Sequence, residues 1–190
     1  MSYRNDAAVD FLATRRSHPP KMLRAPGPDR AEILRLLTLA ARTPDHGKLE
    51  PWRFVVLERA ALNRLAPILR DRVLATGQDQ AVADKAASAF DSPVIVAVVS
   101  TPVASEKVPG WEQFLSAGAV CLGLVNAALA SGWGAAWLTG PAVLDETFGR
   151  SHLGLCEDER IVGLVHLGSR GETPPERPRP DVAAKTTWLE

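Results

Sequence analysis

The feature that most constrains the fold is a long uncharged segment, since no charged residue occurs between Glu112 and Asp145. Its first part, FLSAGAVCLGLVNAALA, is apolar enough to be considered for a membrane helix. The glycines of SGWG, residues 131–134, would end a helix at about Ser131, before a separate apolar segment, AAWL. We therefore predict a buried helix followed by a strand, and no membrane span. A helix apolar on nearly every side belongs in a core or a subunit interface.

Helical and strand patterns alternate along the rest of the chain. Asp29 with Glu32 three residues later resembles a capping arrangement, and apolar residues at helical spacing follow it. The near-continuous run SPVIVAVVS predicts a strand covered on both faces. We expect helices at about 5–16, 29–41, 62–73, 79–90, 109–131 and 143–150, and strands at 53–58, 92–100, 135–138 and 160–169. This alternation predicts a layered α/β or α+β domain.

Length and charge narrow the class of protein. The 190 residues fit a single domain spanning 1–190, in which the last 20 residues, 171–190, hold four prolines and form an extended C-terminal arm. Lysine plus arginine and aspartate plus glutamate both total 22, so the global basic charge that nucleic-acid binding favours is absent. Cys121 and Cys156 form no CxxC pair, and the N-terminus lacks the apolar run of a signal peptide. We expect a cytoplasmic protein with small-molecule or protein partners, and no nucleic acid or membrane.

Standard catalytic signatures are mostly missing. The sequence has no GxSxG elbow, no HExxH and no GxxxxGK[ST] loop. The segment GWGAAW, 132–137, has half of a dinucleotide fingerprint, but it precedes a strand where that fingerprint should follow one. The four histidines are too scattered for a metal-ligand pattern, so no metal is expected.

What remains is a set of polar groups suited to a phosphorylated, planar ligand. Arg15, Arg16 and Ser17 lie where a helix ends, and two guanidinium groups with a hydroxyl can bind a phosphate and neighbouring ribityl oxygens. The alternative is a helix that ends in cations because they favour the negative end of its dipole.

The other candidate binding residues also have structural interpretations that involve no ligand. Arg42 and His46 flank TPD, where a solvated loop is the default interpretation. Trp137 on an apolar strand suits a core position as well as ligand stacking. Arg177 and Arg179 alternate with prolines, and they could reach a phosphate or belong to a solvated arm.

Five segments in the same order resemble the nitroreductase family, collinearly from about residue 7 to 170. They are RRS (15–17), RTPDHGKLEPWRFVVLE (42–58), KVPGWEQFLSAG (107–118), ASGWGAAWLTG (130–140) and FGR...DERIVGLVHLGS (148–169). The resemblance implies a nitroreductase-like three-layer α+β domain, with a central mixed sheet of antiparallel type flanked by helices. It also implies an intertwined homodimer with FMN at the subunit interface and the long helix at the dimer core.

The resemblance also implies roles for individual residues. It assigns Arg15, Arg16 and Ser17 to the FMN phosphate and ribityl region, and Arg42 and His46 to flavin contact from the opposite protomer. It assigns the lining of the flavin to Trp137, Leu138 and Thr139. It associates the helix end 127–132, including Ala127 and Gly132, with the nicotinamide nucleotide, and it leaves Arg177 and Arg179 as weaker phosphate candidates. The branch that the chain most resembles has arginine and serine where this sequence has Leu138 and Thr139, so a side-chain cation is lost.

The implied activity is that of an FMN-dependent NAD(P)H oxidoreductase. Hydride would pass from NADH or NADPH through flavin N5 to a small electron-poor acceptor by a ping-pong mechanism. No catalytic side chain is required because the cofactor carries the chemistry. Arg16 or Arg42 is a candidate source of positive field near the ring, with His46 as a hydrogen-bond donor or proton source. Two alternatives stay open: a non-catalytic FMN-binding dimeric module, and a flavin-fragmenting or dehalogenating member of the same superfamily.

Overall fold

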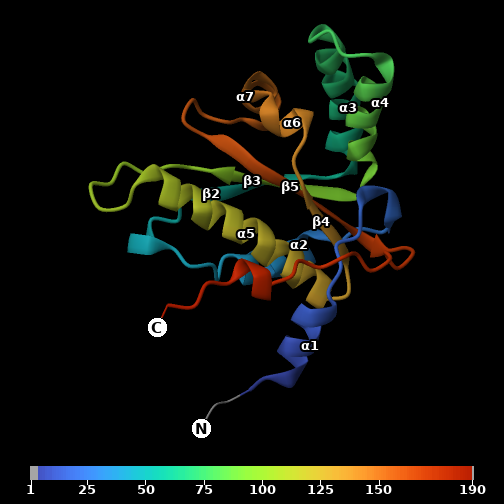
Figure 1. Ribbon diagram of the computed structural model, residues 1–190. Coiled ribbons are helices and arrows are strands. Elements are labelled where there is room, and N and C mark those ends of the chain that lie inside the picture. Colours follow the sequence, from blue (N-terminus) through green and yellow to red (C-terminus); the bar gives the residue numbers. More distant parts are fainter. Residues whose placement is uncertain (1–3, 190) are drawn as a thin grey trace.

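A five-stranded sheet forms the middle layer of the structure, a computed structural model that describes residues 4–189 (Figure 1). Four strands follow the order β1-β5-β3-β2, and β4 pairs with β5. The strands are β1 (Leu23–Arg24), β2 (Trp52–Leu57), β3 (Val94–Ser100), β4 (Gly134–Leu138) and β5 (Arg160–Arg170). This arrangement confirms the predicted layered α+β domain.

The sheet is not mixed, because each of its pairings is antiparallel. That part of the prediction is wrong, and the connections explain why. A single helix, α5 (Gly110–Ala130), joins β3 to β4, so these two strands run in the same direction. They never pair, because β5 lies between them and runs antiparallel to both.

Helices cover the sheet on both faces. Strand β3 is buried along its whole length, as predicted, and its side chains alternate between the two layers. Val96 and Val98 pack with α5 and α2 (Arg30–Ala40), whereas Ile95 and Ala97 pack with α3 (Arg59–Ala75) and α4 (Gln80–Ser88). The domain therefore has two cores, one on each side of the central strands.

Helix α5 confirms the prediction made from the uncharged segment. It begins after Pro109, ends at Ala130 and is followed by the separate strand β4. It is long and apolar enough to cross a membrane by length and composition, but 56% of its most apolar window is buried inside the domain. Four large side chains of α5 stay exposed: Trp111, Phe114, Leu115 and Leu122.

Most predicted element boundaries hold within a few residues. Helix α1 spans Asp6–Thr14, and Asp29 caps α2 by accepting a hydrogen bond from the Glu32 backbone N–H at 2.8 Å. The helix expected near 143–150 is instead two helices, α6 (Pro141–Leu144) and α7 (Glu146–Leu153). Asp145 separates them because its carboxylate accepts a hydrogen bond from Phe148 N–H and so starts a new helix.

Candidate functional site

Arg15, Arg16 and Ser17 follow the last residue of α1 and lie partly buried. The guanidinium of Arg15 donates a hydrogen bond from Nη2 to Ser17 Oγ at 3.0 Å. Its Nε is buried and has no hydrogen-bond partner among residues 4–189. A buried donor without a partner is costly, so this N–H is available for an acceptor that the protein itself does not supply.

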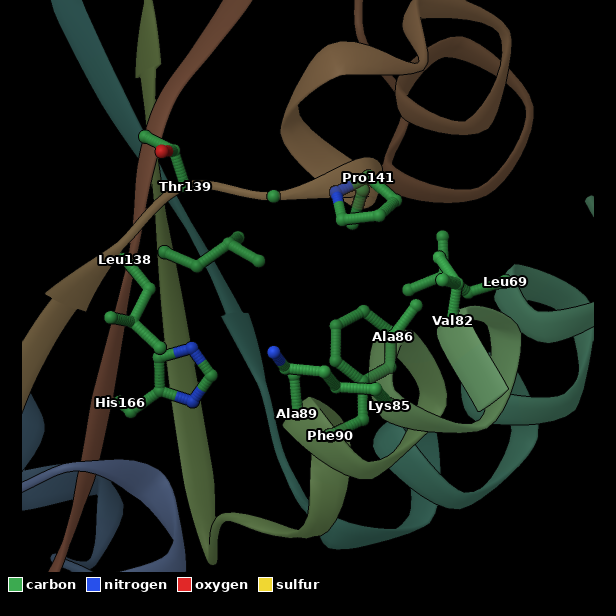
Figure 2. A pocket seen from close by; sticks show the side chains of 13 residues that line it. Leu69, Val82, Lys85, Ala86, Ala89, Phe90, Leu138, Thr139, Pro141 and His166 are labelled. Atoms are coloured by element: carbon green, nitrogen blue, oxygen red, sulfur yellow. The ribbon is translucent and has the colours of Figure 1, made fainter. Parts of the chain in front are cut away.

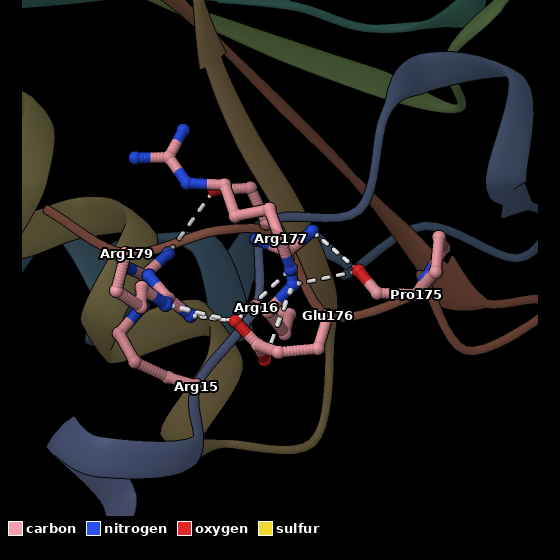
Figure 3. A network of polar contacts seen from close by, with 7 residues as sticks. Arg15, Arg16, Pro175, Glu176, Arg177 and Arg179 are labelled. Atoms are coloured by element: carbon pink, nitrogen blue, oxygen red, sulfur yellow. Dashed lines mark hydrogen bonds and ion pairs between the residues drawn. The ribbon is translucent and has the colours of Figure 1, made fainter.

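The C-terminal arm joins this segment from about 160 residues away in the sequence. Arg16 donates hydrogen bonds to the Pro175 carbonyl at 3.2 and 2.7 Å, and Arg179 forms an ion pair with Glu176 at 2.6 Å (Figure 3). Arg16 also lies 3.9 Å from the Glu176 carboxylate. The arm, which was expected to be extended, is thereby anchored at the end of α1.

The resulting arginine cluster consists of Arg15, Arg16, Arg177 and Arg179. Burial and then the positive charges of Arg179, Arg16 and Arg177 lower the pKa of Arg15. The carboxylate of Glu176 pairs with two of these cations, Arg16 and Arg179 (Figure 3). Helix-dipole stabilisation of α1 does not explain arginines brought in from the other end of the chain. The cluster has the chemistry of a phosphate site, where a dianion would offset the mutual repulsion.

A second feature is a pocket of about 270 Å³ between α4 and the end of β4 (Figure 2). Two of the predicted residues, Leu138 and Thr139, lie on its wall, and Phe90 and Pro141 are among the apolar residues opposite. The volume is near the lower end of small-molecule pockets, and the predominantly apolar lining suits a planar ring.

His166 forms part of the pocket wall and is 1% exposed. Its Nδ1 lies 2.9 Å from Ser92 Oγ, within hydrogen-bond distance. Burial lowers the pKa of His166 to about 4, because a charged imidazolium is disfavoured away from water. The ring is therefore neutral at pH 7.

Trp137 does not share this pocket with its neighbours. Successive side chains of a strand point to opposite faces, so Leu138 faces α4 while Trp137 faces α5. The indole lies against Gly163, where an added Cβ would come within 1.8 Å of Nε1, and near Gly118 of α5. Any contact that Trp137 makes with a ligand must therefore occur on the other side of β4.

The edge of β4 connects the arginine cluster to the pocket. The backbone N–H of His18, directly after Ser17, donates to the Ala135 carbonyl at 2.8 Å. Leu138 stands three residues further along the strand, which is a distance of about 10 Å. A ligand with a phosphate at one end and a ring at the other could follow this edge.

Arg42 and His46 lie outside both features in a single chain. Arg42 is exposed directly after α2, and His46 belongs to the 3-10 turn η2 (His46–Lys48). His46 Nδ1 lies 2.7 Å from Glu112 Oε1 in the first turn of α5. His46 is thus placed beside the first turn of α5, and neither residue lines the pocket.

The predicted nicotinamide segment has a structural role at the end of α5. Ala127 is 9% exposed and packs in the core, and Gly132 takes a left-handed φ of 91° where the helix terminates. Arg170 donates to the carbonyls of Leu129 and Trp133 beside them. Whether this segment contacts a nucleotide stays a prediction.

Sequence reasoning missed Lys85 and His166 as pocket residues. Lys85 is one charged residue among several in a polar helix, and His166 stands in an apolar strand, so neither carries a local signal. Residues 4–189 contain no group of three or more His, Cys, Asp or Glu side chains that could hold a metal ion.

Comparison with known proteins gives one consistent result. The model of the "Nitroreductase family" matches residues 12–169. The protein named "Putative NAD(P)H nitroreductase YdjA" from Escherichia coli strain K12 is 35% identical over 163 residues, covering 85% of this chain and 87% of that protein. A "Putative NAD(P)H nitroreductase" from Haemophilus influenzae is 38% identical over 165 residues, covering 85% and 88%.

Solved structures share the fold at lower sequence identity. A nitroreductase-like family protein from Bacillus cereus superimposes with a TM-score of 0.78 at 20% identity, covering 100% of this chain and 98% of the other. A nitroreductase with bound FMN from Bacteroides fragilis has a TM-score of 0.75 at 19% identity, covering 98% and 100%. At this level of identity the likeness concerns the fold alone.

Proposed function

Because this chain belongs to the nitroreductase family, we propose that it is an FMN-dependent NAD(P)H oxidoreductase that reduces a small electron-poor acceptor. The observation that carries the proposal is the arginine cluster at the end of α1, joined along β4 to an apolar pocket. FMN has the matching parts: a phosphate, a flexible ribityl arm and a planar ring.

The residues present fit this cofactor at its phosphate end. The unpartnered, buried Nε of Arg15 and the surrounding cations supply donors and charge for a dianionic phosphate. Ser17 Oγ already lies within hydrogen-bond distance of Arg15, so the two groups can bind neighbouring oxygens. In this arrangement Arg177 and Arg179 are principal phosphate ligands, together with Arg15 and Arg16.

The ring end is held by the pocket. Leu138 and the apolar wall opposite exclude water from one side of the ring, and Thr139 supplies a hydroxyl at the edge. When bound, FMN supplies the redox chemistry, accepting hydride from NADH or NADPH and delivering it to the acceptor in two successive half-reactions. The protein's own part is to bind, orient and electrostatically stabilise the cofactor.

A homodimer would complete the site. Trp111, Leu115 and Leu122 lie on one face of α5 and are 66%, 61% and 48% exposed, which supports burial of this face against a second copy. His46 lies at the border of the same face, 2.7 Å from Glu112, and Arg42 is exposed four residues before it in the sequence. A second copy docked on this face would lie beside His46, which agrees with the cross-subunit placement that the family resemblance gives Arg42 and His46.

Purified protein tests the proposal directly. It should be yellow or become yellow with added FMN, elute at twice the chain mass, and bleach anaerobically with NADH or NADPH. Mixing the reduced protein with nitroaromatic, quinone and enone acceptors should restore the colour, and steady-state plots should show parallel lines. A protein that is yellow but never bleaches would favour a non-catalytic FMN-binding module, and a colourless protein that ignores FMN would refute both.

A further inference from the structure

A second cavity, of about 600 Å³, lies at the end of the sheet where β5 begins. Its walls come from β5, from α6 and α7, which lie over this end of the strand, and from the beginning of α5 (Figure 1). Thr139 lines both this cavity and the ring pocket, so the two spaces meet at the residue that follows β4. A small molecule in this cavity would lie next to the place proposed for the ring.

Most of the cavity wall is apolar and suits a planar molecule. Phe114 of α5 is 45% exposed and lines the cavity, and Leu155 and Val162 are among its aliphatic neighbours there. An aromatic side chain beside aliphatic ones favours an aromatic ligand through stacking and burial of apolar surface.

The acidic residues of the cavity are already neutralised by arginines. Each of the three carboxylates in the wall forms an ion pair with an arginine that does not itself line the cavity. The pairs are Arg53 with Glu159, Arg72 with Asp145 and Arg150 with Glu146, at 2.6, 2.5 and 2.9 Å. The negative charge of the wall is therefore largely offset.

Arg160, the first residue of β5, is a further cation of the wall and is exposed. Among residues 4–189 its guanidinium has no hydrogen-bond or ion-pair partner. Glu157 and Asp158 precede it in the sequence, but neither lines the cavity. The described residues thus leave one positive charge uncompensated, on a group that can bind a carboxylate through two parallel hydrogen bonds.

Arg160 lies at the opposite end of β5 from the arginine cluster. Ala135, which accepts the hydrogen bond from His18, opposes Leu167, seven residues or about 24 Å from Arg160 along the strand. Leu138 opposes Leu164, which is four residues or about 13 Å from Arg160. Arg160 is therefore too far away for the FMN phosphate, but an aromatic acid could extend from it toward Thr139.

We propose that this cavity binds the acceptor and that Arg160 makes it selective for aromatic acceptors that carry a carboxylate. The inference rests on the proposed function and names the substrate class of the same site. Arg160 binds the carboxylate, and the reducible group at the other end of the acceptor lies toward Thr139. The arginine determines specificity and exchanges neither electrons nor protons.

The test compares para-nitrobenzoate with its neutral analogue para-nitrobenzamide as acceptors for wild type, Arg160→Gln, Arg160→Lys and Arg64→Gln. Arg64 is an exposed cation of α3 that does not line the cavity, so its variant controls for loss of one surface charge. Calorimetric titration of each purified protein with benzoate measures anion binding without turnover. Circular dichroism checks that each variant is folded.

We expect Arg160→Gln to raise the KM for para-nitrobenzoate and the dissociation constant of benzoate about tenfold. The KM for para-nitrobenzamide and both kcat values should change little. Added salt should raise the para-nitrobenzoate KM of wild type more than that of Arg160→Gln, because salt screens the charge. Arg160→Lys should restore part of the affinity, and Arg64→Gln should match wild type.

No change in Arg160→Gln, or an equal change for both acceptors, overturns the role of Arg160 while leaving the proposed function intact. A raised KM for NADPH in place of para-nitrobenzoate would assign the cation to a nucleotide phosphate, which also overturns the proposal. A wild-type protein that never bleaches and reduces neither acceptor refutes the proposed function. The benzoate titration then still decides whether the cavity binds an aromatic acid through Arg160.

Discussion

Replacement of Arg15 by alanine should weaken FMN binding without destabilising the apoprotein. Two opposite effects act at this position. The substitution removes a charge-assisted contact to phosphate, and it also removes one of four mutually repelling cations. A hydrogen bond to a charged group contributes about 1.5–3 kcal/mol, which corresponds to a dissociation constant raised about 10- to 150-fold.

Arg15 contributes little to the stability of the apoprotein. The internal contact of Arg15 is one hydrogen bond to Ser17, worth about 1 kcal/mol, and relief of repulsion from Arg16 and Arg179 offsets it. We therefore expect the apoprotein melting temperature to stay within a few degrees of wild type. The gain in melting temperature on adding FMN should shrink.

Fluorescence titration with FMN and thermal melts of the apoprotein separate these effects. Arg64→Ala serves as the control, because it removes an exposed arginine of α3. Arg15→Lys distinguishes charge from geometry, since an ammonium keeps the charge but not the planar fork. Wild-type affinity in Arg15→Ala would remove Arg15 from the phosphate site. Equal loss of apoprotein stability and FMN affinity would assign it a purely structural role.

Three further predictions concern the packing, an ion pair and the cysteine exposure of the domain. Gly163→Ala should cost about 1–3 kcal/mol in denaturant unfolding and shift tryptophan fluorescence, because the new methyl collides with Trp137; wild-type stability and spectrum would contradict this packing. The pair with Arg72 lowers the pKa of Asp145, so the stability it provides is present above the ordinary carboxyl pKa and is lost as pH falls through the lowered one. Asp145→Asn should flatten that acid slope in pH-dependent melts, and an unaltered slope would refute the assignment. Cys156 is exposed and should react with a thiol reagent, whereas the other cysteine is buried in α5, with its pKa raised to about 12; mass spectrometry of the folded protein should find one modification, and two would contradict the burial.

The sequence predicted those parts of the fold that depend on local pattern. The uncharged run with its glycine break gave helix α5 and strand β4, and the apolar run gave the buried strand β3. Whether the sheet is mixed or antiparallel was not predictable in this way, because it depends on which strands become neighbours. The insertion of β5 between β3 and β4 is a long-range choice that no window of sequence reveals.

The residues of the candidate site also differ in how far local sequence could predict them. Arg15, Arg16 and Ser17 could be proposed because they are adjacent in sequence and suited to phosphate. Arg177 and Arg179 could not be given the same weight, since their value comes from an arm that returns to the end of α1. Local pattern identifies candidate groups, but their number at one point in space is a property of the tertiary structure.

Strand alternation adds a constraint that the family resemblance alone does not contain. The segment Trp137–Thr139 was assigned as a unit to the flavin, yet neighbouring side chains of β4 point to opposite faces. A ring in the pocket beside α4 contacts Leu138, while Trp137 lies against Gly163 on the face that carries α5. Because α5 also presents the exposed apolar face, Trp137 stands toward the side that a second subunit would occupy. The loss of a cation at position 138 therefore concerns the side of β4 that faces α4, and substitutions at 137 and 138 should affect separable properties of the enzyme.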